Sequence, residues 1–377
     1  MGKKISVLHI LNELRYSGAE VMLKSAFAYF AGADIKSTIL STGERQGDYA
    51  SILEQIGYSK KHIPFRKNIQ FLIELGRYLR QNQFDVVHIH TERANFWYAL
   101  TAKGCGVKII IRTVHSSFDF KDLLKLKRTV QRFIMRNCLK VIFIAISESV
   151  KTVEKNIFHN NCIIVRNWID QERFFPIKEK QEKVTARIHF CIPADAFVLV
   201  SIGACREVKN HEAIIDALLT IYSKIENIYY LHVGTGYLEK REKHYAKAKG
   251  VDTKIDFVGQ IDDVRQALIA SDIFVMPSFY EGLGNTILES LATGVSVIAY
   301  NVDGINSVIQ DGYNGLLCET NSDQLAEAVL RLHDDETLKN TIIRNGLNTV
   351  REKYSVNESV YKLINLYLLS LKNKHDK

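Results

Sequence analysis

Short apolar runs alternate with longer amphipathic stretches along this chain, and the alternation happens twice. The first half carries the runs ISVLHIL, STIL, VVHIH, KIIIRTV and VIFIAIS, and the second half carries FVLVSIG, YYLHVG, IDFVG, DIFVMPS and VSVIAY. Stretches of helical period lie between most of them, among them residues 19–31, 69–82, 210–224 and 262–271. Near-continuous apolar strands separated by helices indicate parallel sheets covered on both faces. The sequence therefore predicts an α/β protein with two doubly wound, Rossmann-like domains.

A charged segment without a core strand separates the two series. Residues 171–187, QERFFPIKEKQEKVTAR, are expected to link an N-terminal domain at 1–170 to a C-terminal domain at 188–355. A length of 377 residues suits two cores better than one. The last segment, 356–377, is expected to be a helix that packs back on the N-terminal domain. Two such domains facing each other would form a cleft, with ligands beyond the carboxyl ends of the strands.

The positive charge belongs to the first domain. Residues 1–170 contain 26 Lys and Arg against 14 Asp and Glu, a net +12, and residues 171–377 carry −4, which together give the total of +8. The charge peaks in FKDLLKLKRTVQRFIMRNCLK, residues 120–140, a helical pattern with seven cations and one acid. A basic amphipathic helix favours an anionic membrane surface. A solvated helix with one face in the core is the alternative. No nucleic-acid motif accompanies the charge, so nucleic acid is not an expected partner.

Composition indicates a cytoplasmic location, peripheral on the inner face of the membrane. The chain is 46% hydrophobic and 24% charged, and no apolar run approaches the roughly 20 residues of a membrane-spanning helix. Its six cysteines are scattered without a C-x-x-C pair. This spacing favours reduced thiols over a disulfide framework or a zinc site.

The stretch SFYEGLGNTILESLATGVSVIA, residues 278–299, has the composition of a ligand loop. A buried strand precedes the glycines, and a helix follows with Asn285 as the expected N-cap and Gly294 past its end. Unpaired N–H groups at a helix start suit phosphate. Glu289 could accept bonds from vicinal hydroxyls such as a ribose, and Glu281 could reach another polyol. This combination suits a nucleotide sugar. An ordinary capped strand–loop–helix with two surface glutamates is the alternative.

These segments resemble a known family over essentially the whole chain. The stretch SDIFVMPSFYEGLGNTILESLATGVSVIA is similar to the E-x7-E signature of retaining GT-B glycosyltransferases of family GT4. Other segments match the same family in the same order: LRYSGAE, FDVVHIHT, RTVHSS, VRNWIDQERF, CREVKNH, VGTGYLE, IDFVGQIDDV and DGYNGLLC. The chain is similar to the branch of this family that makes bacterial exopolysaccharide or capsule. The resemblance implies the GT-B fold, a nucleotide-sugar donor and no cofactor or metal.

The resemblance also implies roles for individual residues. The expected catalytic group comprises His115, Glu281, Lys209 and Arg206. The expected donor-binding group comprises Gly18, Gly234, Gly282, Leu283, Gly284, Asn285, Thr286 and Glu289. His90 is expected to contact the acceptor, whereas His88, on the same face of its strand, is more consistent with packing. Lys209 would stabilise the departing nucleoside diphosphate, although a surface lysine is the alternative.

Four positions depart from the family pattern. Ser17 stands where the first loop usually has a glycine, and Ala204 stands where an arginine is frequent. Arg206, two residues later, is the expected replacement for that arginine. Trp168 replaces the glycine of a turn, and Ser307 stands where a glutamate is frequent. None of these changes removes the E-x7-E pair, the active-site histidine or Lys209.

The sequence thus predicts a hexosyl- or N-acetylhexosaminyl-transferase that acts with retention of configuration. Its expected donor is a nucleotide sugar, with UDP as the favoured nucleotide, and its expected acceptor is lipid-linked or a glycan in cell-surface polysaccharide synthesis. Two alternatives stay open: a sugar-nucleotide epimerase on the same fold, and a non-catalytic partner protein that kept the fold.

Overall fold

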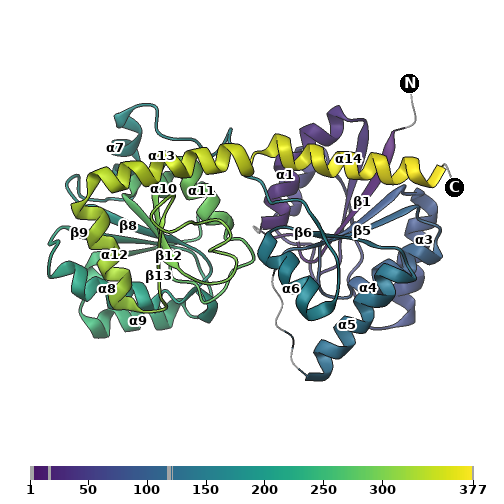
Figure 1. Cartoon of the computed structure of the whole chain (residues 1–377), viewed down its shortest axis with the longest axis horizontal. Coiled ribbons are helices and arrows are strands. Elements are labelled where there is room, and N and C mark those ends of the chain that lie inside the picture. The colour runs from purple at the N-terminus through teal and green to yellow at the C-terminus, as the bar shows by residue number, and fades with distance from the viewer. Residues whose placement is uncertain (1–3, 16–17, 117–119, 121, 376–377) are drawn as a thin grey trace. The chain divides into compact units, whose positions relative to one another are not determined.

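The computed structural model describes residues 4–15, 18–116, 120 and 122–375 (Figure 1). The chain divides into two compact units: unit 1 comprises Met1–Trp168 with Val356–Lys377, and unit 2 comprises Ile169–Ser355. Unit 2 is therefore inserted into unit 1, between its sixth helix and its last.

Unit 1 contains a seven-stranded parallel sheet with the order β3-β2-β1-β4-β5-β6-β7. Its strands are β1 (Ile5–Leu11), β2 (Ile35–Ser41), β3 (Ser59–His62), β4 (Val86–Ile89), β5 (Ile109–Val114), β6 (Ile142–Ala145) and β7 (Ile163–Ile164). Its helices are α1 (Gly18–Gly32), α2 (Ala50–Gln55), α3 (Ile69–Asn82), α4 (Asn95–Gly104), α5 (Asp122–Asn137), α6 (Glu148–Phe158) and α14 (Val356–His375). Helix α14 packs beside α1 (Figure 1), while α3, α4, α5 and α6 pack in sequence against one another.

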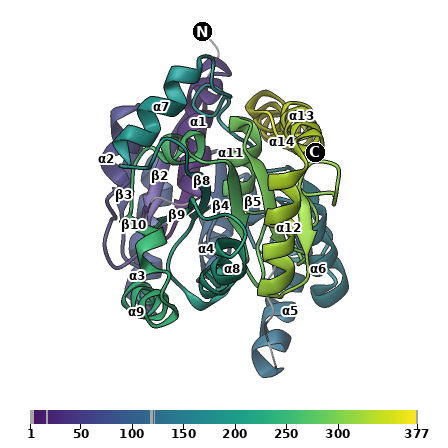
Figure 2. The same ribbon diagram turned by 90° about the vertical axis from the view of Figure 1, so that its left-hand side faces the viewer.

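Unit 2 contains a six-stranded parallel sheet with the order β10-β9-β8-β11-β12-β13. Its strands are β8 (Phe197–Ile202), β9 (Ile228–Val233), β10 (Ile255–Gly259), β11 (Ile273–Met276), β12 (Ser296–Tyr300) and β13 (Leu316–Cys318). Its α-helices are α7 (Lys180–His189), α8 (Glu212–Tyr222), α9 (Glu239–Lys249), α10 (Val264–Ala270), α11 (Asn285–Thr293), α12 (Ser322–Asp334) and α13 (Glu336–Lys353), and two 3-10 turns are η1 (Glu207–Lys209) and η2 (Asp252–Lys254). Helices α8, α9 and α12 cover one face of the sheet, and α7, α10, α11 and α13 cover the other (Figure 2).

The strands form as predicted because both faces of each sheet are covered. Val7, Leu8 and Ile10 of β1 have no exposed surface, which explains why such strands read as unbroken apolar runs rather than alternating ones. Five of the described helices, α3, α6, α10, α12 and α13, start where the side chain of the N-cap residue accepts from a free N–H group. Ser147 accepts from the amide of Val150 at the start of α6, for example. The predicted pair of doubly wound parallel sheets is confirmed.

The structure differs from the sequence predictions at the edges of the sheets and at the linker. Strands β3, β7 and β13 were not predicted, because they are two to four residues long and β3 has the polar sequence SKKH. Residues 171–187 lie within unit 2, and their second half enters α7. Charged side chains of this segment make contacts within unit 2 instead of lying on a free linker. Lys183, for example, pairs with Asp272 at 2.6 Å.

Candidate active site

Each sheet has one place where the strand order reverses. In unit 2 it lies between β8 and β11, and in unit 1 between β1 and β4. Ligands of doubly wound sheets bind at this place, beyond the carboxyl ends of the strands. The loops that follow these strands hold Lys209 (after β8), Glu281 (after β11) and His90 (after β4), and His115 directly follows the next strand, β5. The fold therefore puts the predicted residues at the positions where such sheets carry their sites.

Lys209 and Glu281 form an ion pair in unit 2. The Nζ atom of Lys209 lies 2.5 Å from Oε1 of Glu281, although 72 residues separate them. Their loops are also joined through the backbone, since the amide of Phe279 donates to the carbonyl of Val208 at 2.9 Å. Both charged side chains keep part of their surface exposed, 22% for Lys209 and 15% for Glu281. A phosphate arriving here would meet a positioned ammonium group.

Glycines allow the backbone of these loops to pack closely. Gly234 has φ +144°, and a Cβ there would lie 1.8 Å from the carbonyl oxygen of Gly203. Gly304 has φ +89°, and its Cβ would lie 2.0 Å from the carbonyl oxygen of Glu281. Any other residue would force the loops apart. The Lys209 stem crosses Gly203, where a Cβ would come within 3.3 Å of it.

The predicted N-cap of the glutamate helix is wrong by one residue. Gly284, in the left-handed region at φ 76°, is the N-cap, and Asn285 is the first residue of α11. Leu283 is buried, Thr286 is half-buried, and Gly294 ends the helix with φ 77° as predicted. A residue with positive φ before the helix is most easily a glycine. The start of α11, its N–H groups included, follows β11 after the loop of residues 277–284, at the switch point.

Glu289 lies at the middle of α11 and is half-buried. Burial raises the pKa of its carboxyl group to about 7, and the charge of Arg173 opposes this effect only in part. At neutral pH the group is therefore near its titration midpoint. Arg173 was not singled out in the sequence, because it lies 116 positions away in a segment read as a linker.

Histidines in unit 1 form a chain of contacts. His9 Nδ1 lies 3.1 Å from Nε2 of His90, and Nδ1 of His90 lies 3.1 Å from Nε2 of His115. Burial lowers the pKa of His115 to about 4, with a smaller contribution from Arg112, and lowers the pKa of His9 to about 3. The pKa of His90 is also lowered, by burial and then by its histidine neighbours. All three rings are therefore neutral at pH 7.

A chain of neutral imidazoles fixes the tautomer of each ring. Each contact uses one donor and one acceptor nitrogen, so the choice at one ring sets the next. His115, the last member, keeps Nδ1 outside the chain. The sequence prediction missed His9; its signal was a single histidine within an otherwise apolar strand, in register with His88 across the β1–β4 pair.

His88 packs inside unit 1, as predicted. Its Nδ1 lies 2.6 Å from the hydroxyl of Tyr367 on α14, and its Nε2 lies 2.7 Å from Oγ1 of Thr113. Both ring nitrogens are therefore occupied, and His88 is only 1% exposed. This pair also fixes α14 to the sheet of unit 1.

The remaining predicted residues occupy varied surroundings. Gly18 opens α1, and Ser17 lies outside the described residues. Arg206 is exposed at the start of η1, three residues before Lys209. Trp168 is buried and donates from Nε1 to Ser25 Oγ at 2.9 Å, and Ser307 Oγ donates to the carbonyl of Gly304 at 2.6 Å. These two departures from the family pattern therefore make internal contacts.

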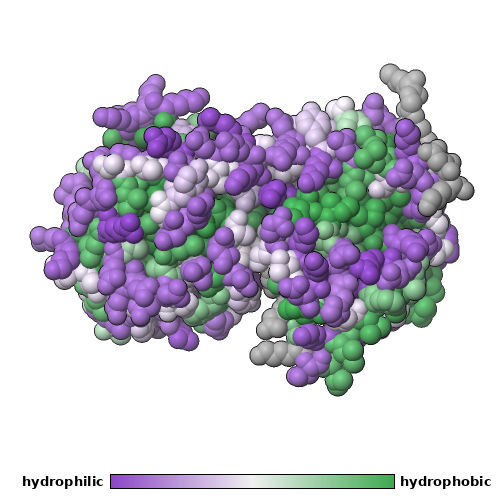
Figure 3. Space-filling model, viewed as in Figure 1, coloured by the Kyte–Doolittle hydropathy of each residue, from purple (hydrophilic) through white to green (hydrophobic). Residues whose placement is uncertain are grey.

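Helix α5 presents its apolar side chains outward and part of its charge inward. Leu123 is 82% exposed, and Leu126 and Phe133 are each 62% exposed, so apolar surface gathers at the end of α5 (Figure 3). Arg132 of the same helix is only 1% exposed. Of the seven cations of this basic stretch, Arg132 is therefore not available to a surface, and Lys121 lies outside the described residues.

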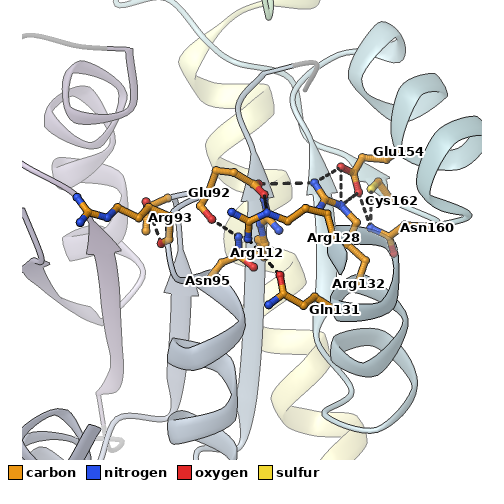
Figure 4. A network of polar contacts seen from close by, with 11 residues as sticks. Glu92, Arg93, Asn95, Arg112, Arg128, Gln131, Arg132, Glu154, Asn160 and Cys162 are labelled. Carbon is orange, nitrogen blue, oxygen red and sulfur yellow. Dashed lines mark hydrogen bonds and ion pairs between the residues drawn. The ribbon is translucent and has the colours of Figure 1, made fainter. Parts of the chain in front are cut away.

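A buried polar network explains this orientation (Figure 4). Arg132 makes bidentate bonds of 2.8–2.9 Å to Glu154 of α6. Arg112 of β5 contacts Glu92, and burial, with Arg132 nearby, lowers the pKa of Arg112 to about 9. Arg128 lies 3.6 Å from Glu92. Helix α5 is thus attached to unit 1 by charge pairs, and its leucines stay outside.

No helix within the described part of the chain is long and apolar enough to cross a membrane.

Comparisons with known proteins agree with this geometry. Residues 16–173 match the family model "Glycosyltransferase Family 4", and residues 185–349 match "Glycosyl transferases group 1". A similar protein is the UDP-Gal:alpha-D-GlcNAc-diphosphoundecaprenol alpha-1,3-galactosyltransferase of Escherichia coli, 26% identical over 83% of each chain. Among solved structures, a glycosyltransferase of Rickettsia africae has a TM-score of 0.85 at 19% identity over 99% of this chain and 100% of its own. HepE of Anabaena, solved with UDP, has a TM-score of 0.84 at 16% identity over 96% of this chain and 99% of its own.

Proposed function

This chain belongs to the GT4-type glycosyltransferases of GT-B fold, and from that we propose that it transfers a hexosyl or N-acetylhexosaminyl group from a UDP-sugar to a lipid-linked acceptor. One observation carries the proposal for the donor: Lys209, Glu281 and the start of α11 meet at the switch point of unit 2. A cation and a helix N-terminus together suit a diphosphate. The solved complex of HepE with UDP supports this choice of nucleotide.

Unit 2 would bind the donor as follows. The diphosphate takes the ammonium group of Lys209 and the N–H groups at the start of α11, with exposed Arg206 free to turn toward it. Glu289 accepts bonds from two ribose hydroxyls, and Glu281, once Lys209 turns to phosphate, accepts from a hydroxyl of the sugar. Charge that develops on the departing diphosphate is then stabilised by groups already in place. The binding of phosphate by side chains and a helix dipole leaves no role for Mg²⁺ in this step.

Unit 1 would supply the acceptor side. His115 is neutral at pH 7 because burial lowers its pKa to about 4, so it can donate a hydrogen bond to a sugar hydroxyl without adding charge. His90 orients His115 through their 3.1 Å contact; because its other ring nitrogen contacts His9, it keeps no nitrogen for a hydrogen bond to the predicted acceptor. Retention of configuration is what the family implies for the product.

The surface of α5 favours a lipid-linked acceptor. Leu123, Leu126 and Phe133 are exposed beside the exposed cations Lys125 and Lys127. Apolar side chains with flanking lysines are typical of helices that lie in a membrane interface, and each cation near an anionic leaflet is worth about 1 kcal/mol. We propose that α5 holds the enzyme on the anionic inner leaflet. The diphosphoundecaprenol substrate named for the Escherichia coli relative supports an acceptor of this class.

A donor panel tests the reaction. Purified protein is offered UDP-, GDP-, ADP- and dTDP-sugars, with and without a membrane lipid extract, and free nucleotide is measured. We expect release from UDP-sugars that the extract increases. Conversion of the sugar without nucleotide release would indicate an epimerase, and no turnover with any donor and extract would indicate a non-catalytic protein. The anomeric configuration of the isolated product then tests retention.

Vesicle flotation tests the surface separately. Lys125→Glu with Lys127→Glu should reduce binding to anionic vesicles at low salt, and Leu123→Ser with Leu126→Ser should reduce it at high salt as well. The matched control is Lys240→Glu with Lys247→Glu on α9, which removes the same charge from exposed positions of unit 2. Wild-type protein that ignores anionic vesicles at low salt would refute the membrane proposal and leave a soluble glycan as the acceptor.

A further inference from the structure

Four buried side chains with metal-binding atoms meet behind the loop of residues 203–211 in unit 2, which carries Lys209 and is called the phosphate loop below. They are Cys205 in the loop after β8, His211 at the start of α8, His232 on β9 and Glu242 on α9. Each is at most 2% exposed. The Sγ atom, one nitrogen of each imidazole and a carboxylate oxygen all lie within 4.8 Å of one another. None of the four has a part in the donor or acceptor contacts proposed above.

The separations within the cluster are those of ligands around one ion. His211 Nδ1 lies 3.1 Å from His232 Nε2 and 3.2 Å from Oε1 of Glu242. His232 Nε2 lies 3.2 Å from Oε2 of Glu242. A tetrahedral zinc ion with Zn–N and Zn–O distances of about 2.0–2.1 Å has ligand atoms about 3.3–3.4 Å apart. The His–His edge, and the edge from one imidazole to one oxygen of Glu242, are thus close to those of a tetrahedral site.

Hydrogen bonds alone leave this cluster badly matched. A neutral imidazole has one N–H group, and Nδ1 of His211 faces both a carboxylate oxygen and a second imidazole nitrogen. If His211 donates to Glu242, then His232 Nε2 must donate into the same narrow space to avoid two facing lone pairs. Yet the 3.2 Å contact between His232 Nε2 and the buried Oε2 of Glu242 is poorly aligned for a hydrogen bond. Buried polar atoms without partners are uncommon and call for an explanation.

The charges also balance for a divalent ion. A coordinated Cys205 thiolate and the Glu242 carboxylate, with two neutral imidazoles, would cancel the charge of Zn²⁺ and leave a neutral buried site.

We propose that Cys205, His211, His232 and Glu242 bind one Zn²⁺ ion in a closed, tetrahedral, structural site. Four protein ligands leave no open position for substrate, which is the pattern of a structural rather than a catalytic zinc. Cys205 and His211 flank Lys209 in sequence, so the ion would tie both ends of the phosphate loop to β9 and α9. Its function is to hold this loop in place.

The other histidine group does not have this arrangement. His9, His88 and His90 also bring donor atoms within 4.8 Å. Both nitrogens of His88, however, already contact Tyr367 and Thr113. The two remaining rings point one nitrogen each along the chain to His115. Both nitrogens of His88 and of His90 are thus engaged, although Nε2 of His9 has no partner among the described residues. Because this group lacks the carboxylate and thiol of the first cluster, the zinc assignment is restricted to unit 2.

Metal analysis of the full chain tests the proposal. Protein purified without chelators from zinc-supplemented cells should contain about one zinc per chain by plasma mass spectrometry. After exchange with Co²⁺ it should show the intense visible bands of a tetrahedral site and a thiolate charge-transfer band near the ultraviolet. Zinc content well below stoichiometric, together with no such cobalt spectrum on the wild-type protein, would overturn it.

Two variants assign the ligands. Cys205→Ser should abolish the thiolate charge-transfer band, and Glu242→Gln should reduce zinc retention on dialysis by at least tenfold. Cys138→Ser, at an exposed cysteine, is the matched control and should keep both. If Cys205→Ser keeps the charge-transfer band, the metal lies elsewhere and the proposal is wrong. If variants do not fold, the wild-type zinc content and cobalt spectrum still decide, and neither readout depends on catalysis.

Discussion

Glu289→Gln should stabilise unit 2 and weaken donor binding at the same time. Burial raises the pKa of Glu289 from 4.5 to about 7 in the folded chain. Because the folded state holds the proton more tightly, the stabilising effect is complete below pH 4.5 and is lost as pH rises through 7. One pKa unit corresponds to 1.36 kcal/mol, so the carboxyl group costs about 3 kcal/mol of folding stability at pH 8.5. Glutamine has the same shape without a charge to bury.

Hydrogen exchange of the α11 amides measures the stability of the helix that carries Glu289. Both tryptophans, Trp97 and Trp168, lie in unit 1, so their fluorescence does not report on unit 2. The free energy of exchange in α11 should rise for the variant by up to about 3 kcal/mol at pH 8.5, and by much less at pH 5. Glu327→Gln, at an exposed position of α12, is the control. A gain that is equal at both pH values, or absent at pH 8.5, would refute the raised pKa.

The same carboxyl group should make nucleotide binding depend on pH. Only the ionised form accepts strong bonds from both ribose hydroxyls, so wild-type affinity for UDP should fall as pH drops below 7. Glu289→Ala should cost roughly 2–4 kcal/mol of UDP binding at pH 8, measured by titration calorimetry. Unchanged affinity in the alanine variant would remove Glu289 from the donor site.

Two further predictions concern the metal requirement and the packing of α14. Nucleotide release should proceed at the same rate with or without added Mg²⁺ or Mn²⁺, because Lys209 and the start of α11 neutralise the negative charge of the phosphates. A rate that requires either ion would contradict this. A loss of activity on long chelation that only Zn²⁺ reverses would instead report on the Cys205 cluster. Tyr367→Phe should destabilise unit 1 by about 1–3 kcal/mol, because it leaves Nδ1 of buried His88 without a partner. The fluorescence of Trp168 monitors the unfolding of unit 1 in denaturant. An unchanged unfolding transition would show that the 2.6 Å contact between Tyr367 and His88 contributes nothing to stability.

Many of the candidate site residues could be predicted from the sequence, because they lie on the segments that follow buried strands. Lys209, Glu281 and His115 are each placed by a strand whose apolar run is unmistakable, and a parallel sheet brings such loops to one edge. The cap of α11 was misplaced by one residue. Asn285 is a good N-cap by residue type, but Gly284 alone accepts the left-handed backbone that the loop requires.

Other features depend on packing that composition does not encode. The pattern of residues 120–140 shows an amphipathic helix, but not which of its sides meets the protein. Glu92 and Glu154 draw Arg132 inward, and neither is near α5 in sequence. The raised pKa of Glu289 depends on burial in the same way. The cluster of Cys205, His211, His232 and Glu242 was missed because C-x-x-C spacing does not reveal side chains that a sheet gathers from separate elements.

The return of α14 to unit 1 has a consequence for how the protein is made. On the ribosome, all seven strands of unit 1 emerge before unit 2, but Val360, Leu363, Ile364 and Tyr367 of its core emerge afterwards. Unit 2 is continuous and can fold as soon as it leaves the exit tunnel, whereas unit 1 must wait with part of its apolar face uncovered. Nascent chains stalled before residue 356 should therefore hold a protease-resistant unit 2 beside a unit 1 that chaperones still bind.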